Sequence, residues 1–357
     1  MNITTTKKVL EGAIYAAQRV APTTAPLPLL SGVLLSATGK NLTVTGTNLN
    51  TTVVCTITPE EIIDEGEVVL PAKHLYELVK RLPDGPVNLT QEKDCVKIFY
   101  EKQQASVRFY ASDDFPVVPK EKDIETIEVN IEALRSATQK VAFACSDDQV
   151  QGNLTGVHFS VTPFGVELVA TNRHRISYVN VSDIAVGNDF KITIPKSTIE
   201  QLKLFPDKTI KIAFDESMVV FEGENLLIVS SLLAGRFFDH NSLPRDFTSE
   251  CTIKTKELLA TLNRVALISK KVCLSSKMDS LIITAEGEKG WVCESIEIRH
   301  AGKPINIVLS AEYLIDALSV SGNKVTLKFL DARACQVECG NFYCFIMAMV
   351  SPGQKSA

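Results

Sequence analysis

Two pairs of adjacent aspartates, Asp113-Asp114 and Asp147-Asp148, have the residue type that metal chemistry needs. Carboxylates that share divalent ions are common in enzymes that cleave phosphodiester bonds. Neighbours along a chain rarely converge on one ion without further ligands, and each pair follows a serine, a combination typical of turns. We therefore expect solvated loops at both pairs and keep a metal-dependent nuclease as the alternative.

Other catalytic patterns are weak. His174 lies between Arg173 and Arg175, where it could serve acid–base or phosphate chemistry, yet no nucleophile or carboxylate stands at an informative spacing. The chain has no Gly-rich phosphate loop, no HExxH and no dinucleotide fingerprint. The nine cysteines are scattered and odd in number, which suits free thiols in a reducing compartment. Cys335, Val337 and Cys339 alternate with polar residues as one face of a strand would, so we expect buried side chains there and no zinc site. The sequence predicts no catalytic residues and no metal site.

The elements that must position any site recur three times along the 357 residues. A short apolar run, a Pro or Ser that opens an amphipathic helix and a closing turn occupy residues 68–85, 192–208 and 307–324. Each repeat also begins with a helix, at residues 6–20, 130–145 and 255–269. Leu10, Leu134 and Leu258 lie on the apolar faces of these helices and are separated by 124 residues in both steps. A repeat of this length is a whole domain.

Alternating apolar and polar residues follow each helix and indicate strands. We predict an α+β fold made of three tandem helix–strands–helix–strands domains, in which two helices back mostly antiparallel sheets. Polar, proline-bearing joints at residues 115–123 and 238–246 separate the copies. The predicted domains are therefore residues 1–120, 121–245 and 246–357.

Basic side chains recur on the paired helices although the net charge of the chain is −5. Three similar domains could align these helices into one surface that attracts nucleic-acid phosphates without reading bases. The alternative is that Lys and Arg are simply what exposed helix faces carry, and the second helix of the third repeat shows only Glu312 and Asp316. The candidate DNA-binding residues are Lys8, Arg19, Lys73, Lys80, Arg135, Lys196, Lys203 and Arg264.

The location of the protein follows from two features of the sequence. No apolar run approaches the length of about 18 residues that suggests a membrane span. The first twenty residues lack the charged-then-apolar order of a signal peptide, so we expect a cytoplasmic protein.

The order of several segments resembles the bacterial DNA sliding clamp, the beta subunit of DNA polymerase III, over essentially the whole chain. These segments are residues 27–30 before Gly32, residues 154–156 (LTG), 169–175 (VATNRHR), 235–239 (GRFFD) and 345–349 (FIMAM). The resemblance implies the DNA clamp fold, in which this chain forms half of a closed ring. Such a ring is a head-to-tail homodimer whose helices face duplex DNA, associated with the nucleoid, and it confers processivity on the replicative polymerase.

The same resemblance implies sites. The dimer interface would join Val107 and Phe109 of one subunit to Leu267 and Ile268 of the other, residues that could equally be ordinary core. A pocket would bind peptides of the polymerase, the clamp loader and repair proteins. Its residues would be Leu154, Thr171, Arg173, His174, Arg175, Ile176, Pro244, Phe345, Met347 and Met349. No cofactor is implied, because the clamp loader supplies the ATP-driven opening.

The chain departs from the family pattern at two points of this pocket. Arg173 replaces a glycine in the loop of residues 171–175, and residues 347–351 read Met-Ala-Met-Val-Ser in place of Met-Pro-Met-Arg-Leu. Besides the nuclease, a monomeric peptide-binding scaffold that lacks ring closure remains an alternative.

Overall fold

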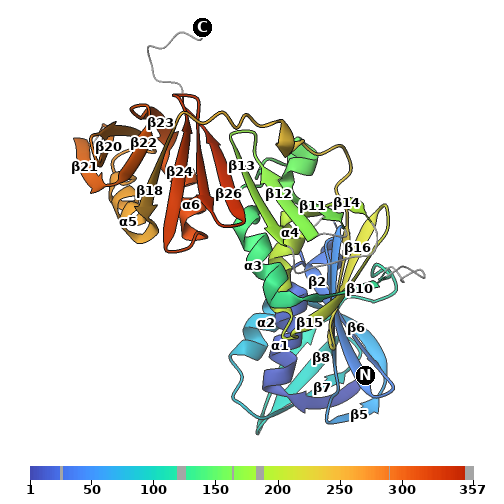
Figure 1. The fold of residues 1–357 in the computed structure, drawn as a ribbon. Coiled ribbons are helices and arrows are strands. Elements are labelled where there is room, and N and C mark those ends of the chain that lie inside the picture. The colour runs from blue at the N-terminus through green and yellow to red at the C-terminus, as the bar shows by residue number, and fades with distance from the viewer. Residues whose placement is uncertain (25–26, 119–125, 163–164, 182–188, 289, 350–357) are drawn as a thin grey trace. The chain divides into compact units, whose positions relative to one another are not determined.

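The computed structural model describes every residue except 25–26, 119–125, 163–164, 182–188, 289 and 350–357. Part of the predicted joint at residues 115–123 and the end of the chain lie outside this described part. The chain divides into two compact units (Figure 1). Unit 1 comprises Met1–Ile131 and Gln201–Leu232, and unit 2 comprises Glu132–Glu200 and Leu233–Ala357. Each unit contains two antiparallel sheets.

Unit 1 contains a sheet of five strands and a sheet of eight. The five-stranded sheet has the order β5 (Glu61–Asp64), β1 (Asn2–Thr6), β7 (Pro86–Gln91), β8 (Cys95–Tyr100), β9 (Gln103–Arg108). The eight-stranded sheet has the order β10 (Thr126–Asn130), β15 (Thr209–Phe214), β16 (Met218–Glu222), β17 (Leu226–Ser231), β4 (Thr51–Ile57), β3 (Asn41–Thr47), β2 (Gly32–Thr38), β6 (Gly66–Pro71). The larger sheet therefore joins strands that are distant in sequence, because β17 pairs with β4.

Two helices, α1 (Lys7–Gln18) and α2 (Ala72–Lys80), pack against each other in unit 1. The apolar face expected for α1 is confirmed, since Leu10 and Ile14 are fully buried in a core that also contains Leu75 of α2. Gly46 of β3 allows α1 to come this close, because a Cβ there would lie 2.0 Å from the carbonyl oxygen of Ala17. A short 3₁₀ helix, η1 (Pro28–Ser31), precedes β2.

Unit 2 contains a nine-stranded sheet and a four-stranded sheet. The nine-stranded sheet has the order β14 (Phe190–Pro195), β11 (Gly156–Thr162), β12 (Gly165–Thr171), β13 (Arg175–Val181), β26 (Phe342–Met347), β25 (Ala334–Cys339), β24 (Lys324–Leu330), β18 (Ser249–Lys254), β22 (Arg299–Gly302). The four-stranded sheet has the order β21 (Gly290–Glu297), β20 (Ser280–Gly287), β19 (Lys271–Lys277), β23 (Asn306–Ser310). The antiparallel pairing of β13 with β26 places Ile176 opposite Phe345 and Tyr178 opposite Tyr343.

The remaining helices confirm the other predicted positions. They are α3 (Ile131–Ala142), α4 (Lys196–Ile199), α5 (Thr255–Val265) and α6 (Ala311–Ser319), with the 3₁₀ segments η2 (Gln149–Thr155), η3 (Glu200–Leu204) and η4 (His240–Ser242). The second helix of the second repeat is short, because α4 passes into η3 after one turn and Pro206 follows. No helix in the described part of the chain is long and apolar enough to span a membrane.

The aspartate pair at residues 147–148 has structural partners. Asp147 Oδ1 accepts a hydrogen bond from Lys196 Nζ at 2.9 Å. Asp148 caps η2, because its Oδ1 accepts from the backbone N–H of Val150 at 3.0 Å. Asp113 and Asp114 are exposed in a turn. Among the described residues, no three His, Cys, Asp or Glu side chains are grouped as metal ligands would be.

Candidate functional site

A tight turn between β12 and β13 fixes one wall of the candidate site. Asn172 Oδ1 accepts hydrogen bonds from the backbone N–H groups of His174 and Arg175, both at 3.1 Å. Thr171 Oγ1 donates to the carbonyl oxygen of Arg175 at 2.7 Å and accepts from the N–H of Arg173 at 3.1 Å. Side-chain to backbone bonds of this kind stabilise turns. The turn holds Arg173 at a φ of 74°, in the left-handed region that a glycine occupies more easily.

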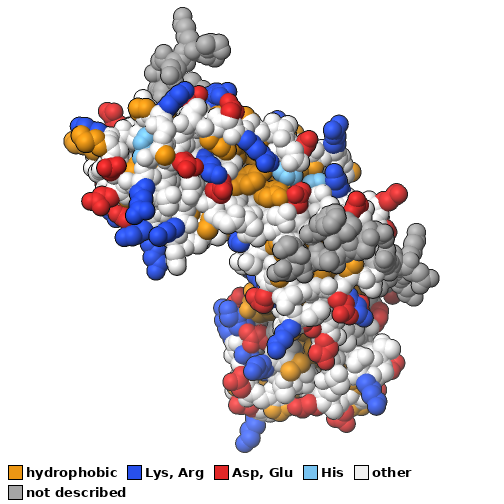
Figure 2. Space-filling view, in the orientation of Figure 1, with side chains coloured by type: hydrophobic (Ala, Val, Ile, Leu, Met, Phe, Trp, Pro, Cys, Tyr) orange, Lys and Arg blue, Asp and Glu red, His pale blue; other side chains and the backbone are white. Residues whose placement is uncertain are grey.

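A cavity of about 330 Å³ opens beside this turn, within unit 2. Leu154, Ile176 and Phe345 provide apolar wall, and Met347 is 47% exposed at its edge. Figure 2 shows hydrophobic side chains gathered over β12, β13 and β26, with Lys, Arg and His side chains beside them. No Asp or Glu is among the described residues that line the cavity, whereas Arg173 and His174 are exposed there. An apolar hollow with a flexible thioether and a cationic rim suits an apolar peptide side chain.

The structure brings together most of the residues predicted for the pocket. The cavity is lined by Leu154, Thr171, Arg173, His174, Arg175, Ile176, Phe238, Leu243, Phe345 and Met347. Pro244 lines a neighbouring cavity instead. Met349 lines neither, and its backbone N–H donates to the carbonyl oxygen of Val308 at 2.8 Å.

Phe238 and Leu243 line the cavity but are absent from the predicted set. Both belong to the polar stretch of residues 238–246, which the sequence indicates as a domain joint. Phe238 and Leu243 are large apolar residues within an otherwise polar stretch, and this contrast is the sequence feature that could have indicated them. Phe238 is 43% exposed and Met347 is 47% exposed, so both present apolar surface to solvent at this cavity.

Two histidines and a tyrosine form an aromatic border beside the cavity. The ring of His158 stacks on Phe237 at a centroid distance of 4.6 Å, and burial lowers the pKa of His158 to about 4. The ring centroids of Tyr178 and His240 are 4.9 Å apart, and the Tyr178 hydroxyl donates a hydrogen bond to Glu167 Oε1 at 2.9 Å. Burial and this hydrogen bond raise the pKa of Tyr178 to about 12. Burial also lowers the pKa of His240, and Glu167 opposes that effect. These rings are therefore neutral at pH 7.

The candidate DNA-binding residues differ in how their charge is engaged. Lys8, Lys73 and Lys203 are exposed and form no ion pair with any residue that the structure describes. Lys80 is also exposed, with Nζ 5.6 Å from the centroid of the Tyr76 ring. The other four have polar partners: Arg19 bonds to Gln201 at 2.8 Å, Arg135 pairs with Glu132, Lys196 pairs with Asp147, and Arg264 pairs with Glu294.

The four candidate interface residues also differ. Val107 is 4% exposed and belongs to the core of unit 1, and Phe109 packs partly buried against that core. In unit 2, Leu267 is 77% exposed just after α5, and Ile268 is partly buried. Each group lies near an edge, because β9 ends the five-stranded sheet and α5 packs against β21, which ends the four-stranded sheet. Edge strands present unpaired backbone groups to a second chain.

Comparison with known proteins covers nearly the whole chain. Models of the N-terminal, central and C-terminal domains of the DNA polymerase III beta subunit match residues 1–119, 128–239 and 240–349. The beta sliding clamp of Bacillus subtilis is 27% identical over 354 residues, which span 93% of this chain and 94% of that protein. That of Synechococcus elongatus is 26% identical over 336 residues, 89% of each chain. The crystal structure of the Bacillus subtilis DNA polymerase sliding clamp is 25% identical, with a TM-score of 0.91 and coverage of 98% of this chain and 99% of the other.

Proposed function

The chain belongs to the DNA polymerase III beta subunit family, and on that premise we propose that it works as a DNA sliding clamp. It is a non-enzymatic processivity factor, a homodimeric ring that encircles duplex DNA and recruits the replicative polymerase and other partners. The consecutive matches of the three domain models carry this proposal. We place its action in the cytoplasm, on the DNA of the nucleoid, and we keep the division into domains 1–120, 121–245 and 246–357 as part of the proposal.

A ring holds DNA by topology, so its contacts with phosphate must be weak enough to slide. The exposed lysines of α1 and α2 meet that requirement, because they offer charge without a base-reading element. We propose Lys8, Lys73, Lys80 and Lys203 as the main phosphate contacts, with Arg19, Arg135, Lys196 and Arg264 secondary because polar partners already engage them. The net charge of −5 fits weak contacts better than tight ones.

Ring closure requires two different surfaces to meet, since a head-to-tail contact is heterologous. We propose that β9 of one subunit and β21 of the other provide these surfaces, each as the last strand of its sheet. Leu267 supplies exposed apolar area. Val107 is buried and its backbone pairs with Val96 of β8, so the outward backbone groups of β9 are those of its neighbours Ser106 and Arg108. Trp291 on β21 is 75% exposed and is a further candidate for burial in this contact.

Recruitment is assigned to the cavity beside residues 171–175. Its apolar wall and cationic rim suit a short peptide that inserts apolar side chains. We propose that partner proteins use this cavity one at a time, and that Phe238 and Leu243 contact the peptide together with the residues predicted from sequence.

The test is retention on circular DNA compared with linear DNA. The protein is loaded onto nicked circles by its cognate clamp loader, and half of the sample is then linearised. A ring stays on circles and leaves linear DNA by sliding off its ends. Equal, salt-sensitive loss from both forms would mean ordinary phosphate binding and would favour a monomeric scaffold. Gel filtration with light scattering then distinguishes a dimer from that monomer.

A further inference from the structure

A second cavity, of about 450 Å³, lies on the same face of the nine-stranded sheet as the first. Ile176 of β13 is paired with Phe345 of β26, and both line the first cavity. Tyr178 and Tyr343 lie two residues further along these strands; they are also paired, and both line the second cavity. Alternate residues of a strand point to the same face, so both cavities open on one side of β13 and β26. Leu243 lines both cavities. The two hollows therefore adjoin along one seam of the sheet.

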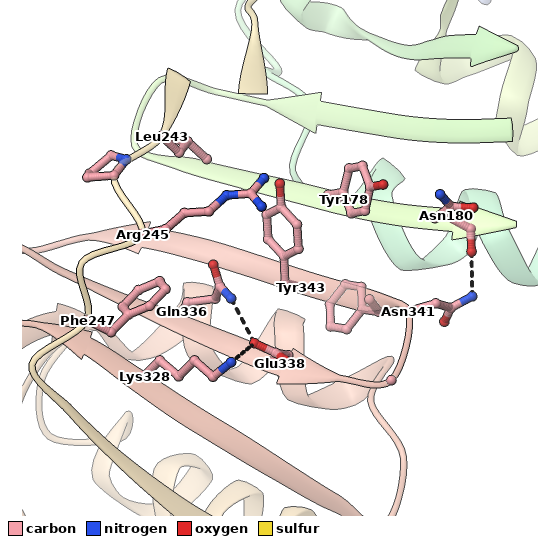
Figure 3. A pocket seen from close by; sticks show the side chains of 13 residues that line it. Tyr178, Asn180, Leu243, Arg245, Phe247, Lys328, Gln336, Glu338, Asn341 and Tyr343 are labelled. Carbon is pink, nitrogen blue, oxygen red and sulfur yellow. Dashed lines mark hydrogen bonds and ion pairs between the residues drawn. The ribbon is translucent and has the colours of Figure 1, made fainter. Parts of the chain in front are cut away.

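The floor of this second cavity is aromatic and held in place. The Tyr178 and Tyr343 rings stack with a centroid distance of 4.7 Å and an interplanar angle of 18°. The hydrogen bond from Tyr178 to Glu167 fixes one ring of the pair. Phe247, from the stretch that connects η4 to β18, contributes a third aromatic side chain (Figure 3). Such a floor can receive the main chain and side chains of an extended segment.

The charges around the cavity leave one cation unmatched. Glu338 Oε2 is 2.6 Å from Lys328 Nζ and accepts a hydrogen bond from Gln336 Nε2 at 2.9 Å. The charges of Lys328 and Glu338 therefore cancel. Arg245 is exposed and has neither an ion pair nor a hydrogen bond with any described residue. Figure 3 shows its guanidinium group beside the Tyr343 ring, turned toward the cavity. Its positive charge is close enough to lower the pKa of Tyr343, against the larger effect of burial.

We propose that the second cavity binds the part of a partner peptide that flanks the residues held in the first cavity, and that Arg245 pairs there with an Asp or Glu of that flank. This inference rests on the proposed peptide-binding role of the first cavity. Leu243 lines both cavities, so one peptide could run from the first into the second. Arg245 offers the second cavity a positive charge that complements an acidic side chain. A guanidinium–carboxylate pair next to an aromatic floor is stronger than a pair in open solvent.

Selection from a random peptide library long enough to cross both cavities tests this proposal. The library is selected on wild-type protein, on Arg245→Gln and on Arg333→Gln. Arg333 is a matched control, because it is an exposed arginine of unit 2 that pairs with Asp246 and Asp331 and lines neither cavity. We expect wild-type and Arg333→Gln pools to share an apolar core with an acidic residue at a fixed distance on one side. The Arg245→Gln pool should keep the core and lose the acidic residue.

A double-mutant cycle on one enriched peptide supplies the affinity. Replacing its acidic residue with Gln should weaken binding to wild type about tenfold and leave binding to Arg245→Gln nearly unchanged. A wild-type pool with an apolar core and no acidic flank would overturn the second cavity alone. An acidic preference that persists in the pool selected on Arg245→Gln would also overturn the proposal for the second cavity alone. A wild-type pool without any apolar core would overturn the first cavity as a peptide site, and the extension with it.

Discussion

Arg175, at the start of β13, and Asp316, in α6, form an ion pair in which Nη1 and Oδ2 are 2.5 Å apart. The arginine side chain is 7% exposed, and its Nη2 donates to the carbonyl oxygen of Phe143 at 2.5 Å. Its guanidinium carbon lies 4.2 Å from the centroid of the Tyr313 ring. The pair joins the segment matched by the central-domain model to the segment matched by the C-terminal one.

Replacement of this arginine should weaken unit 2. Arg175→Met removes the ion pair, the bond to Phe143 and the contact with Tyr313, and leaves Asp316 without its cation. We expect the free energy of unfolding to fall by about 3 kcal/mol, measured by urea unfolding. Arg333→Met is the control, because its ion pairs are exposed and should contribute less than about 1 kcal/mol. Equal losses in the two variants would contradict a structural role for the Arg175–Asp316 pair.

Arg173 gives a prediction of the opposite sign. Its φ of 74° costs a residue with a Cβ about 1–2 kcal/mol, and glycine avoids that cost but loses more chain entropy on folding. Arg173→Gly should therefore raise the free energy of unfolding slightly, by up to about 1 kcal/mol. Arg173→Ala keeps the backbone strain and serves as the comparison. A glycine variant less stable than the alanine variant would mean that the turn is not strained at this position.

Acid should destabilise unit 2 through His158. Its pKa is near 4 in the folded protein and 6.5 in the reference state, so the unfolded chain takes up a proton first as the pH falls. The contribution of neutral His158 to the free energy of unfolding is fully present above pH 6.5 and is lost as the pH falls from 6.5 to 4. We expect this loss to be roughly 2 kcal/mol once solvent screening of the partly exposed ring is included. His158→Phe keeps the stack on Phe237 and should flatten this part of the stability–pH curve. The lowered pKa of His240 adds a smaller decline of the same sign, which the variant should retain.

Salt dependence distinguishes free from engaged cations on the helices. Lys73 is exposed with no ion pair among the described residues, whereas Arg264 pairs with Glu294. Lys73→Gln should lower the slope of log K against log salt for a short duplex by about 0.9, the value for one phosphate contact. Arg264→Gln should change the slope less. The opposite ranking, measured by fluorescence anisotropy, would move the DNA contact to Arg264.

Self-association should depend on Leu267. The exposed leucine gains roughly 2 kcal/mol when an interface buries it, so Leu267→Glu should weaken the dimer at least about tenfold. Met278 is 85% exposed in the turn between β19 and β20 and provides a matched control. Light scattering over a concentration series should show monomer for Leu267→Glu and dimer for Met278→Glu. A dimer in both variants would remove Leu267 from the interface.

Local periodicity was enough to predict the repeated elements of the fold. The apolar spacing around Leu10 predicts α1, and the core of unit 1 buries that face. Non-local relationships left no local pattern: the pairing of β13 with β26 and of β17 with β4 joins segments more than a hundred residues apart. Phe238 and Leu243 were missed for the same reason, because only the folded connection places them against β13 and β26. Arg173 and Arg175 look alike in sequence, yet one is exposed and the other is buried against aromatic rings.

The pairing of β4 with β17 also means that the larger sheet of unit 1 cannot be completed until β17 has been synthesised. β4 ends at Ile57, and the strand that covers its open edge begins at Leu226. At ordinary translation rates the nascent chain waits on the order of ten seconds or more between these points. Throughout that interval the backbone groups of Thr52 and Val54 lack the partners they have in the finished sheet, and an uncovered edge is a template for pairing with another chain. Synthesis at high ribosome density should therefore produce more aggregation of this protein than slow, well-spaced synthesis.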